Sequence, residues 1–143
     1  MRPRILLVLA LVALALPAAA LTARRVIHGP AGGGSGAVDI TLVTSKKTGA
    51  VTKLTRFEFN NIQATCKGFP PTAVSGQFPH TIKVKSDGTF SANVKANGGR
   101  VTYTVSGKFK NPNSASGKLH VKGSAPGCPT ADTGKVHWSA KHN

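Results

Sequence analysis

The chain has 143 residues, of which 40% are hydrophobic, and this suits a single folded domain with a real core. Nineteen lysines and arginines stand against four acidic residues, which gives a net charge of +15. The four carboxylates are Asp39, Glu58, Asp87 and Asp132. Only Asp39 and Glu58 could form an acid pair, so the composition argues against an enzyme that needs two positioned carboxylates.

Residues 1–20 have the three parts of a secretory signal peptide. A short basic start precedes an unbroken apolar run over residues 5–16, and Pro17 and three alanines follow. We predict export of the protein, with cleavage after Ala20 or, as the second choice, after Ala23. An uncleaved N-terminal membrane anchor is the alternative, because the apolar segment comes close to the length that spans a bilayer.

Removal of residues 1–20 takes away Arg2 and Arg4, which leaves 17 basic residues against 4 acidic ones and a net charge of +13. The two cysteines, Cys66 and Cys128, both remain. Because export places them in an oxidising compartment, we predict the disulfide Cys66–Cys128. Two free buried thiols are the alternative.

The stretch R-R-V-I-H-G-P-A-G-G-G-S-G that follows the leader ends in glycines. We therefore expect residues 21–36 to be a flexible tether and residues 37–143 to be the folded domain. Within this domain apolar and polar side chains alternate, as at Val38, Ile40 and Leu42, and no helical stripe is found. Such alternation is typical of strands with one face against a core.

Turn signals separate these strands, at residues 45–49, at Asp87-Gly88, at residues 97–99 and at residues 111–113. The alternation changes parity at Asn60-Asn61, which predicts a β-bulge. Pro79 predicts an edge position or a strand break. The fold class expected from this pattern is all-β, an antiparallel β-sandwich of about eight strands with one disulfide, and a small β-barrel is the alternative.

Two similar strings, V-S-G-Q-F from Val74 and V-S-G-K-F from Val105, place a glycine where the alternation expects an inward side chain. A glycine at such a position more often indicates close packing or a bulge than contact with a ligand. Trp138 and Tyr103 also have inward parity. For both aromatic residues we expect core packing rather than a platform for stacking sugars.

Lysines fill the outward positions of the predicted strands and form a candidate polyanion-binding surface. They are Lys83, Lys85, Lys95, Lys108, Lys110, Lys118, Lys122 and Lys135. Like charges gathered on one sheet face attract anionic polymers by long-range steering and counterion release. The alternative is that the charge only keeps the protein soluble and its sheet edges unpaired.

The type of basic residue limits the class of partner that this surface can bind. The remaining chain has 13 lysines against four arginines, and lysine supplies a point charge rather than a specific fork for phosphate or carboxylate. No aromatic residue stands at the outward positions, so we expect no specific recognition of nucleic acid. No cofactor motif is present and none is expected. His120 and His137 could meet across strands, but exposed histidines are expected there rather than a metal site.

Several short strings occur along the chain in a recognisable order. They are D-G-T-F from Asp87, V-S-G-K-F from Val105, S-G-K-L from Ser116, and Cys128 followed by T-G-K-V-H-W-S-A-K. In this order the chain resembles small exported all-β domain proteins of high-GC Gram-positive (actinobacterial) soil bacteria. The resemblance implies export, an all-β domain and a terminal V-x-W-x-A strand, and it carries over no catalytic residue.

The sequence therefore predicts a secreted, non-enzymatic β-domain without a transmembrane segment in its mature part. Loose binding of anionic envelope or extracellular polymers is the expected function. The alternative is a structural or protein-interaction module that meets a protein partner through loops such as residues 67–72 or 124–133, while the charge maintains solubility.

Overall fold

The computed structural model describes residues 22–143, which form ten β-strands and one short 3₁₀ turn. The predicted signal peptide, residues 1–20, lies outside the described residues. The strands are β1 (Thr22–Pro30), β2 (Ala37–Ser45), β3 (Val51–Cys66), β4 (Thr72–Gln77), β5 (Ile82–Lys83), β6 (Thr89–Ala96), β7 (Val101–Asn111), β8 (Ser114–Ala125), β9 (Cys128–Asp132) and β10 (Val136–Lys141), and the turn spans Asn97–Gly99. The predicted all-β fold is confirmed, with ten strands where about eight were expected. Within this part of the chain, no helix is long and apolar enough to cross a membrane.

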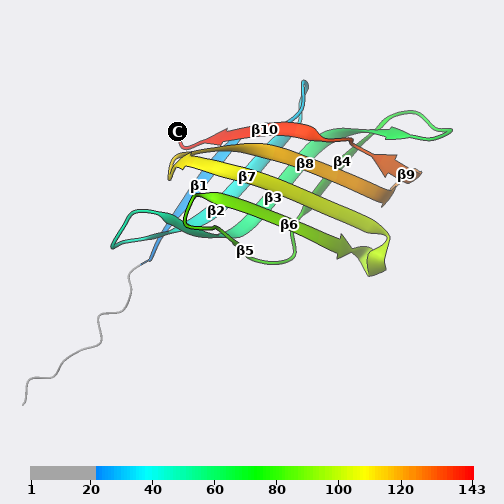
Figure 1. Cartoon of the computed structure of the whole chain (residues 1–143). Helices are drawn as coiled ribbons and strands as arrows, with labels where there is room; N and C mark the ends of the chain where they lie inside the picture. Colours follow the sequence, from blue (N-terminus) through cyan, green and yellow to red (C-terminus); the bar gives the residue numbers. More distant parts are fainter. Residues whose placement is uncertain (1–21) are drawn as a thin grey trace, which may run out of the picture.

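The strands lie in two layers whose directions cross (Figure 1). One layer holds β1, β2 and β3, and the other holds β6, β7, β8 and β10. Hydrogen bonds run in the order β10-β1-β2-β3-β9-β8-β7-β6, β4 and β5 pair with β3, and β10 also pairs with β8. All the pairings are antiparallel, and they connect the two layers through β9 and through β10. Both the expected sandwich and its barrel alternative are compatible with this arrangement.

The core between the layers is formed by the side chains that the sequence pattern places on the inward face of each strand. Phe57 and Trp138 are 1% and 3% exposed, and their ring centroids lie 5.5 Å apart in an edge-on contact. Phe78 also packs edge-on against Phe57, with 5.5 Å between the ring centroids. Tyr103 packs edge-on against Phe59, 5.3 Å between centroids. The aromatic side chains of this sheet are therefore used to fill the interior.

The inward glycines are explained by this aromatic packing. A Cβ at Gly76 would lie 2.7 Å from Cζ of Phe59, and one at Gly107 would lie 2.6 Å from Cζ of Phe90. In each case a ring from the same interior covers the backbone of the glycine. The expectation of close packing is confirmed for both V-S-G strings.

The expected tether over residues 21–36 is wrong from Thr22 onward. The strand β1 pairs with β2 along its whole length, from Thr22 opposite Ser45 to Pro30 opposite Ala37. Residues 31–36 close this hairpin, and the backbone N–H of Ala31 donates to the carbonyl of Gly36 at 2.8 Å. Residues 22–36 thus belong to the folded part, which was expected to begin only at Ala37. The glycines belong to a hairpin loop, a role that their composition does not distinguish from a linker.

Three local predictions are confirmed. Cys66, the last residue of β3, forms a disulfide with Cys128, the first residue of β9, with 5.8 Å between their Cα atoms. The register between β3 and β4 shifts at Asn60-Asn61, and Asn61 has a φ of 54°. Pro79 lies in the break between β4 and β5.

Candidate functional site

The outward face of β6, β7, β8 and β10 is built from lysines and short hydroxyl side chains. One row across the strands runs Thr89, Lys108, Ser116 and Ser139, and the next runs Ser91, Ser106, Lys118 and His137. All eight lysines predicted at outward positions are exposed. The backbone alternation therefore places a stripe of ammonium groups over a face of serine and threonine.

Four of the eight lysines come together along two adjoining hollows on this face. The first hollow, of about 470 Å³, is lined by Lys85, Lys108 and Lys118 together with serines and Thr89. The second, of about 180 Å³, is lined by Lys118, His120 and Lys135 with Thr104 and Ser106. Both hollows include Ser106 and Lys118, so they form one shallow basic groove.

The other four lysines lie outside this groove. Lys95 and Lys122 belong to the same face, one on each side of Thr102. Lys110 lies near the end of β7. Lys83 is on β5 and pairs with Lys53 of β3, away from the main stripe.

One end of the groove is bounded by a hydrogen-bonded pair of side chains that the sequence did not predict. His120 Nε2 lies 2.7 Å from Oδ1 of Asp132, and the side chains are 33% and 36% exposed. The backbone N–H of Gly134 donates to the same oxygen at 2.8 Å. This N–H, and then His120, lower the pKa of Asp132, so the carboxylate stays charged. His120 thus pairs with a carboxylate instead of joining His137 at a metal.

Asp87 lies near the other end, in the predicted turn. Its Oδ1 accepts hydrogen bonds from the hydroxyl of Thr89 at 2.6 Å and from the backbone N–H of Thr89 at 2.9 Å. These bonds lower the pKa of Asp87, and the charges of Lys108 and Lys85 add to the effect. The turn predicted at Asp87-Gly88 is confirmed, and it uses this carboxylate.

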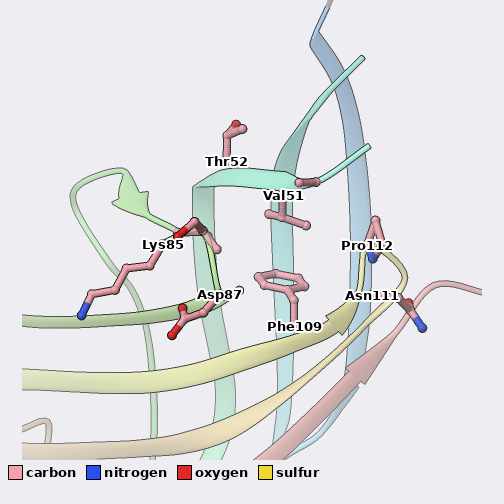
Figure 2. Close-up of a pocket in the computed structure, with 11 residues that line it drawn as sticks. Val51, Thr52, Lys85, Asp87, Phe109, Asn111 and Pro112 are labelled. Atoms are coloured by element: carbon pink, nitrogen blue, oxygen red, sulfur yellow. The ribbon is translucent and has the colours of Figure 1, made fainter. Parts of the chain in front are cut away.

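A separate cavity of about 380 Å³ opens at one end of the two layers, beside the basic groove (Figure 2). Figure 2 shows the ring of Phe109 facing Val51 at its centre, whereas the ammonium group of Lys85 points away from the cavity. Thr52, Asn111 and Pro112 also line the cavity, together with Ala50, Val84 and residues 86–88. The centre is apolar, so the cavity suits a small apolar group rather than an anion.

The opposite layer brings Asp39 and Glu58 side by side, which the sequence could not show. They are Cα partners on β2 and β3, and His28 of β1 lies opposite Asp39. Glu58 forms an ion pair with Arg56, which neutralises one member of the pair. Among residues 22–143, no group of three or more histidine, cysteine or acidic side chains is placed to hold a metal ion.

Comparison of the chain with protein-family models, with curated proteins and with solved structures finds no match. The class of the protein is therefore defined by its fold and its site. It is an all-β protein with one disulfide, and one sheet face carries a lysine- and hydroxyl-lined groove.

Proposed function

We propose that this protein is exported and binds anionic polymers of the cell envelope or surroundings through the basic face of β6, β7, β8 and β10, without catalysing a reaction. The observation that carries the proposal is the convergence of Lys85, Lys108, Lys118 and Lys135 on one groove. Charges gathered in this way raise the local positive potential and bind polyanions by releasing their counterions.

The position of two of these lysines argues against edge protection as their sole role. Lysines that prevent sheet edges from pairing belong on edge strands. Lys108 is on β7, which pairs with β6 and β8, and Lys118 is on β8, which pairs with β7 and β10. Both residues therefore lie in the interior of the sheet, where no edge needs protection.

The chemistry of the face sets the kind of binding. Lysine offers a strongly hydrated point charge rather than the planar fork of arginine. Serine and threonine hydroxyls between the lysines can donate further hydrogen bonds to anionic oxygens. We therefore expect binding that depends on the charge of the polymer rather than on the order of its units. Its affinity should fall steeply as the salt concentration rises.

The proposal of export depends on the predicted signal peptide, residues 1–20. It is consistent with the disulfide, since such bridges persist in oxidising compartments. The strand β1 begins at Thr22, so cleavage after Ala20 leaves it whole, whereas cleavage after Ala23 removes its first two residues. We accordingly favour Ala20. Mass spectrometry of the exported protein should give Leu21 as its N-terminus, and a retained leader would contradict export by cleavage.

The test is a binding titration of the mature protein against an anionic and a neutral polysaccharide from low to high salt. Binding to the anionic polymer should fall with salt, and binding to the neutral one should be weak throughout. The variant Lys108→Gln/Lys118→Gln/Lys122→Gln should bind less at every salt concentration. Its stability should change little, because exposed lysines contribute little to the fold.

A matched control removes the same charge elsewhere. Lys46 and Lys47 lie in the turn before β3, and Lys67 follows Cys66 at its other end, all three exposed. The variant Lys46→Gln/Lys47→Gln/Lys67→Gln should retain most of the binding. Equal losses in both variants would show that only net charge matters, and binding that survives high salt would overturn the proposal.

A protein-interaction module is the second candidate, and one observation favours it. Phe69 is 54% exposed in the loop between β3 and β4, beside the disulfide. An exposed aromatic residue on a constrained loop is a common anchor in protein interfaces. This candidate predicts that Phe69→Ser, and not the lysine variants, abolishes capture of a partner at high salt.

A further inference from the structure

The lysines of the groove follow a diagonal across the sheet. Lys118 pairs with Ser106 on β7, two residues from Lys108. On its other side Lys118 pairs with His137 on β10, two residues from Lys135. Each lysine therefore lies one strand across and two residues along from the next, and the two hollows follow this line.

The register fixes the spacing of these charges. Diagonal neighbours on an antiparallel sheet are separated by about 7–8 Å, more than residues directly opposite each other. Lys85 extends the line at one end, because its N–H donates to the carbonyl of Thr89 at 2.8 Å and Thr89 lies opposite Lys108. Lys108, Lys118 and Lys135 are thus attached to the sheet along one line (the track) at equal steps of register, and Lys85 lies beyond the Lys108 end of this line.

A linear polymer whose anionic groups are spaced at the same interval as these lysines would contact several of them at once. In a polymer of three-carbon polyols joined by phosphodiesters, neighbouring phosphorus atoms are separated by about six bonds. A peptide unit contributes about three bonds and spans at most about 3.6 Å when extended, so six bonds span about 7 Å. This interval agrees with the diagonal. The backbone of such a polymer is also flexible enough to adjust to the twist of the sheet.

The side chains beside the track indicate a polymer without bases. Ser106, Ser116 and Thr104 lie between the lysines and offer hydroxyls to phosphate and polyol oxygens. The aromatic residues of these strands pack inward: Phe90, Phe109 and Trp138 are buried, and Tyr103 packs against Phe59. Bases would therefore find no phenyl, phenol or indole ring on which to stack on this face, only the imidazoles of His120 and His137.

We propose that the face binds an extended polyol-phosphate polymer along the line Lys85–Lys108–Lys118–Lys135. This inference rests on the proposed function and names the class of anion that the groove takes. Its specificity against rigid polycarboxylates comes from the interval between charges. Its specificity against nucleic acid, whose phosphates are also about six bonds apart, comes from the lack of Phe, Tyr and Trp rings on which bases could stack. A polycarboxylate whose charges sit on rigid sugar rings cannot adjust its intervals in the same way, so it should bind more weakly.

The experiment compares four probes of similar length at one moderate salt concentration: poly(glycerol phosphate), alginate as a polycarboxylate, single-stranded poly(dT) and neutral dextran. The wild-type protein should bind poly(glycerol phosphate) about tenfold more tightly than alginate or poly(dT), and dextran least of all. Competition between the probes, measured by fluorescence anisotropy of labelled poly(glycerol phosphate), gives these ratios directly.

Two variants of equal charge separate the track from the rest of the face. Lys108→Gln/Lys118→Gln/Lys135→Gln removes the diagonal, and Lys95→Gln/Lys110→Gln/Lys122→Gln removes three exposed lysines of the same layer outside it. The diagonal variant should lose about tenfold or more in affinity for poly(glycerol phosphate), and the other variant about threefold or less. Circular dichroism and thermal melting of both variants establish that they are folded.

The outcomes distinguish this inference from the function on which it rests. If all three anionic probes bind equally, or if both variants lose affinity equally, the polyol-phosphate track is overturned and general polyanion binding stands. Tighter binding of poly(dT) would also overturn it, in favour of nucleic acid. If dextran binds as well as the anions, both proposals fail.

Discussion

Trp138 and Gly117 are Cα partners on β10 and β8, and the indole lies where a side chain at Gly117 would have to go. A Cβ at Gly117 would lie 2.8 Å from Cζ2 of Trp138, and one at Gly107 on the next strand would lie 2.7 Å from the same atom. The two glycines thus make room for the largest side chain of the core beneath the basic face. This packing lies directly beneath the strands that carry Lys108 and Lys118.

Adding a methyl group at Gly107 should therefore destabilise the protein. We expect Gly107→Ala to lower the free energy of unfolding by about 1–3 kcal/mol, because Phe90 and Trp138 must shift to admit the Cβ. Gly33→Ala is the control, since no atom lies within 4 Å of a Cβ at that position. Urea unfolding followed by the fluorescence of Trp138 measures both. Equal stability of the two variants would contradict the packing described.

The strand β1 should contribute to stability, unlike a tether. Ile27 is 0% exposed, whereas its neighbour Val26 is 48% exposed. We expect Ile27→Ala to cost about 2–4 kcal/mol through the lost apolar contacts and the cavity left behind. Val26→Ala should cost about 0.5 kcal/mol or less. The same urea titration checks this, and two equally small effects would indicate that β1 is not docked.

Loss of the disulfide should destabilise the protein strongly. The bridge links residues 62 apart, and closing such a loop stabilises by about 4 kcal/mol in the chain-entropy description. Replacing both Cys66 and Cys128 with Ala should lower the urea midpoint accordingly, and a reducing agent should then have no further effect. Reduction of the unfolded wild-type chain should raise its mass by about two daltons for one bridge. An unchanged mass would mean that the thiols are free.

Asp132 should stabilise the protein only while it is ionised. Its pKa is lowered in the folded state by the N–H of Gly134 and by His120, so folding favours the carboxylate. That contribution is fully present above the unfolded pKa of about 3.9 and is lost as the pH falls through the lowered folded pKa. Wild type should exceed Asp132→Asn by about 1 kcal/mol or less at neutral pH, because the pair is partly exposed.

The measurement for Asp132 is the difference in thermal midpoint between wild type and Asp132→Asn from neutral pH down to about pH 2. The difference should be constant above about pH 4 and shrink at lower pH. Asp39→Asn serves as the control at a carboxylate for which no such hydrogen bonds are found among the described residues. A difference that grows as the pH falls would contradict the assignment.

Period-two alternation was enough to predict most of the strands after Ala37, their turns and the inward aromatic residues, because one face of each strand is buried. It missed β9 (Cys128–Asp132), which lies within the expected loop 124–133 and is too short to show a clear alternation. It failed for β1, where Ile27 is the only fully buried side chain and arginines occupy neighbouring positions. The exposure of the lysines followed from the same alternation. Their diagonal, the His120–Asp132 pair and the approach of Asp39 to Glu58 depend on strand register, which local sequence does not determine.

If the lysines of the groove act together on an anionic polymer, their removal must change how the affinity depends on salt. The most direct test is the slope of log K against log salt for poly(glycerol phosphate), measured for wild type and for Lys108→Gln/Lys118→Gln/Lys135→Gln. Each lysine that neutralises a phosphate contributes about 0.7 to the slope for a single-stranded polymer. We expect the slope of the variant to be shallower by about 2. An unchanged slope would show that these lysines do not contact the polymer.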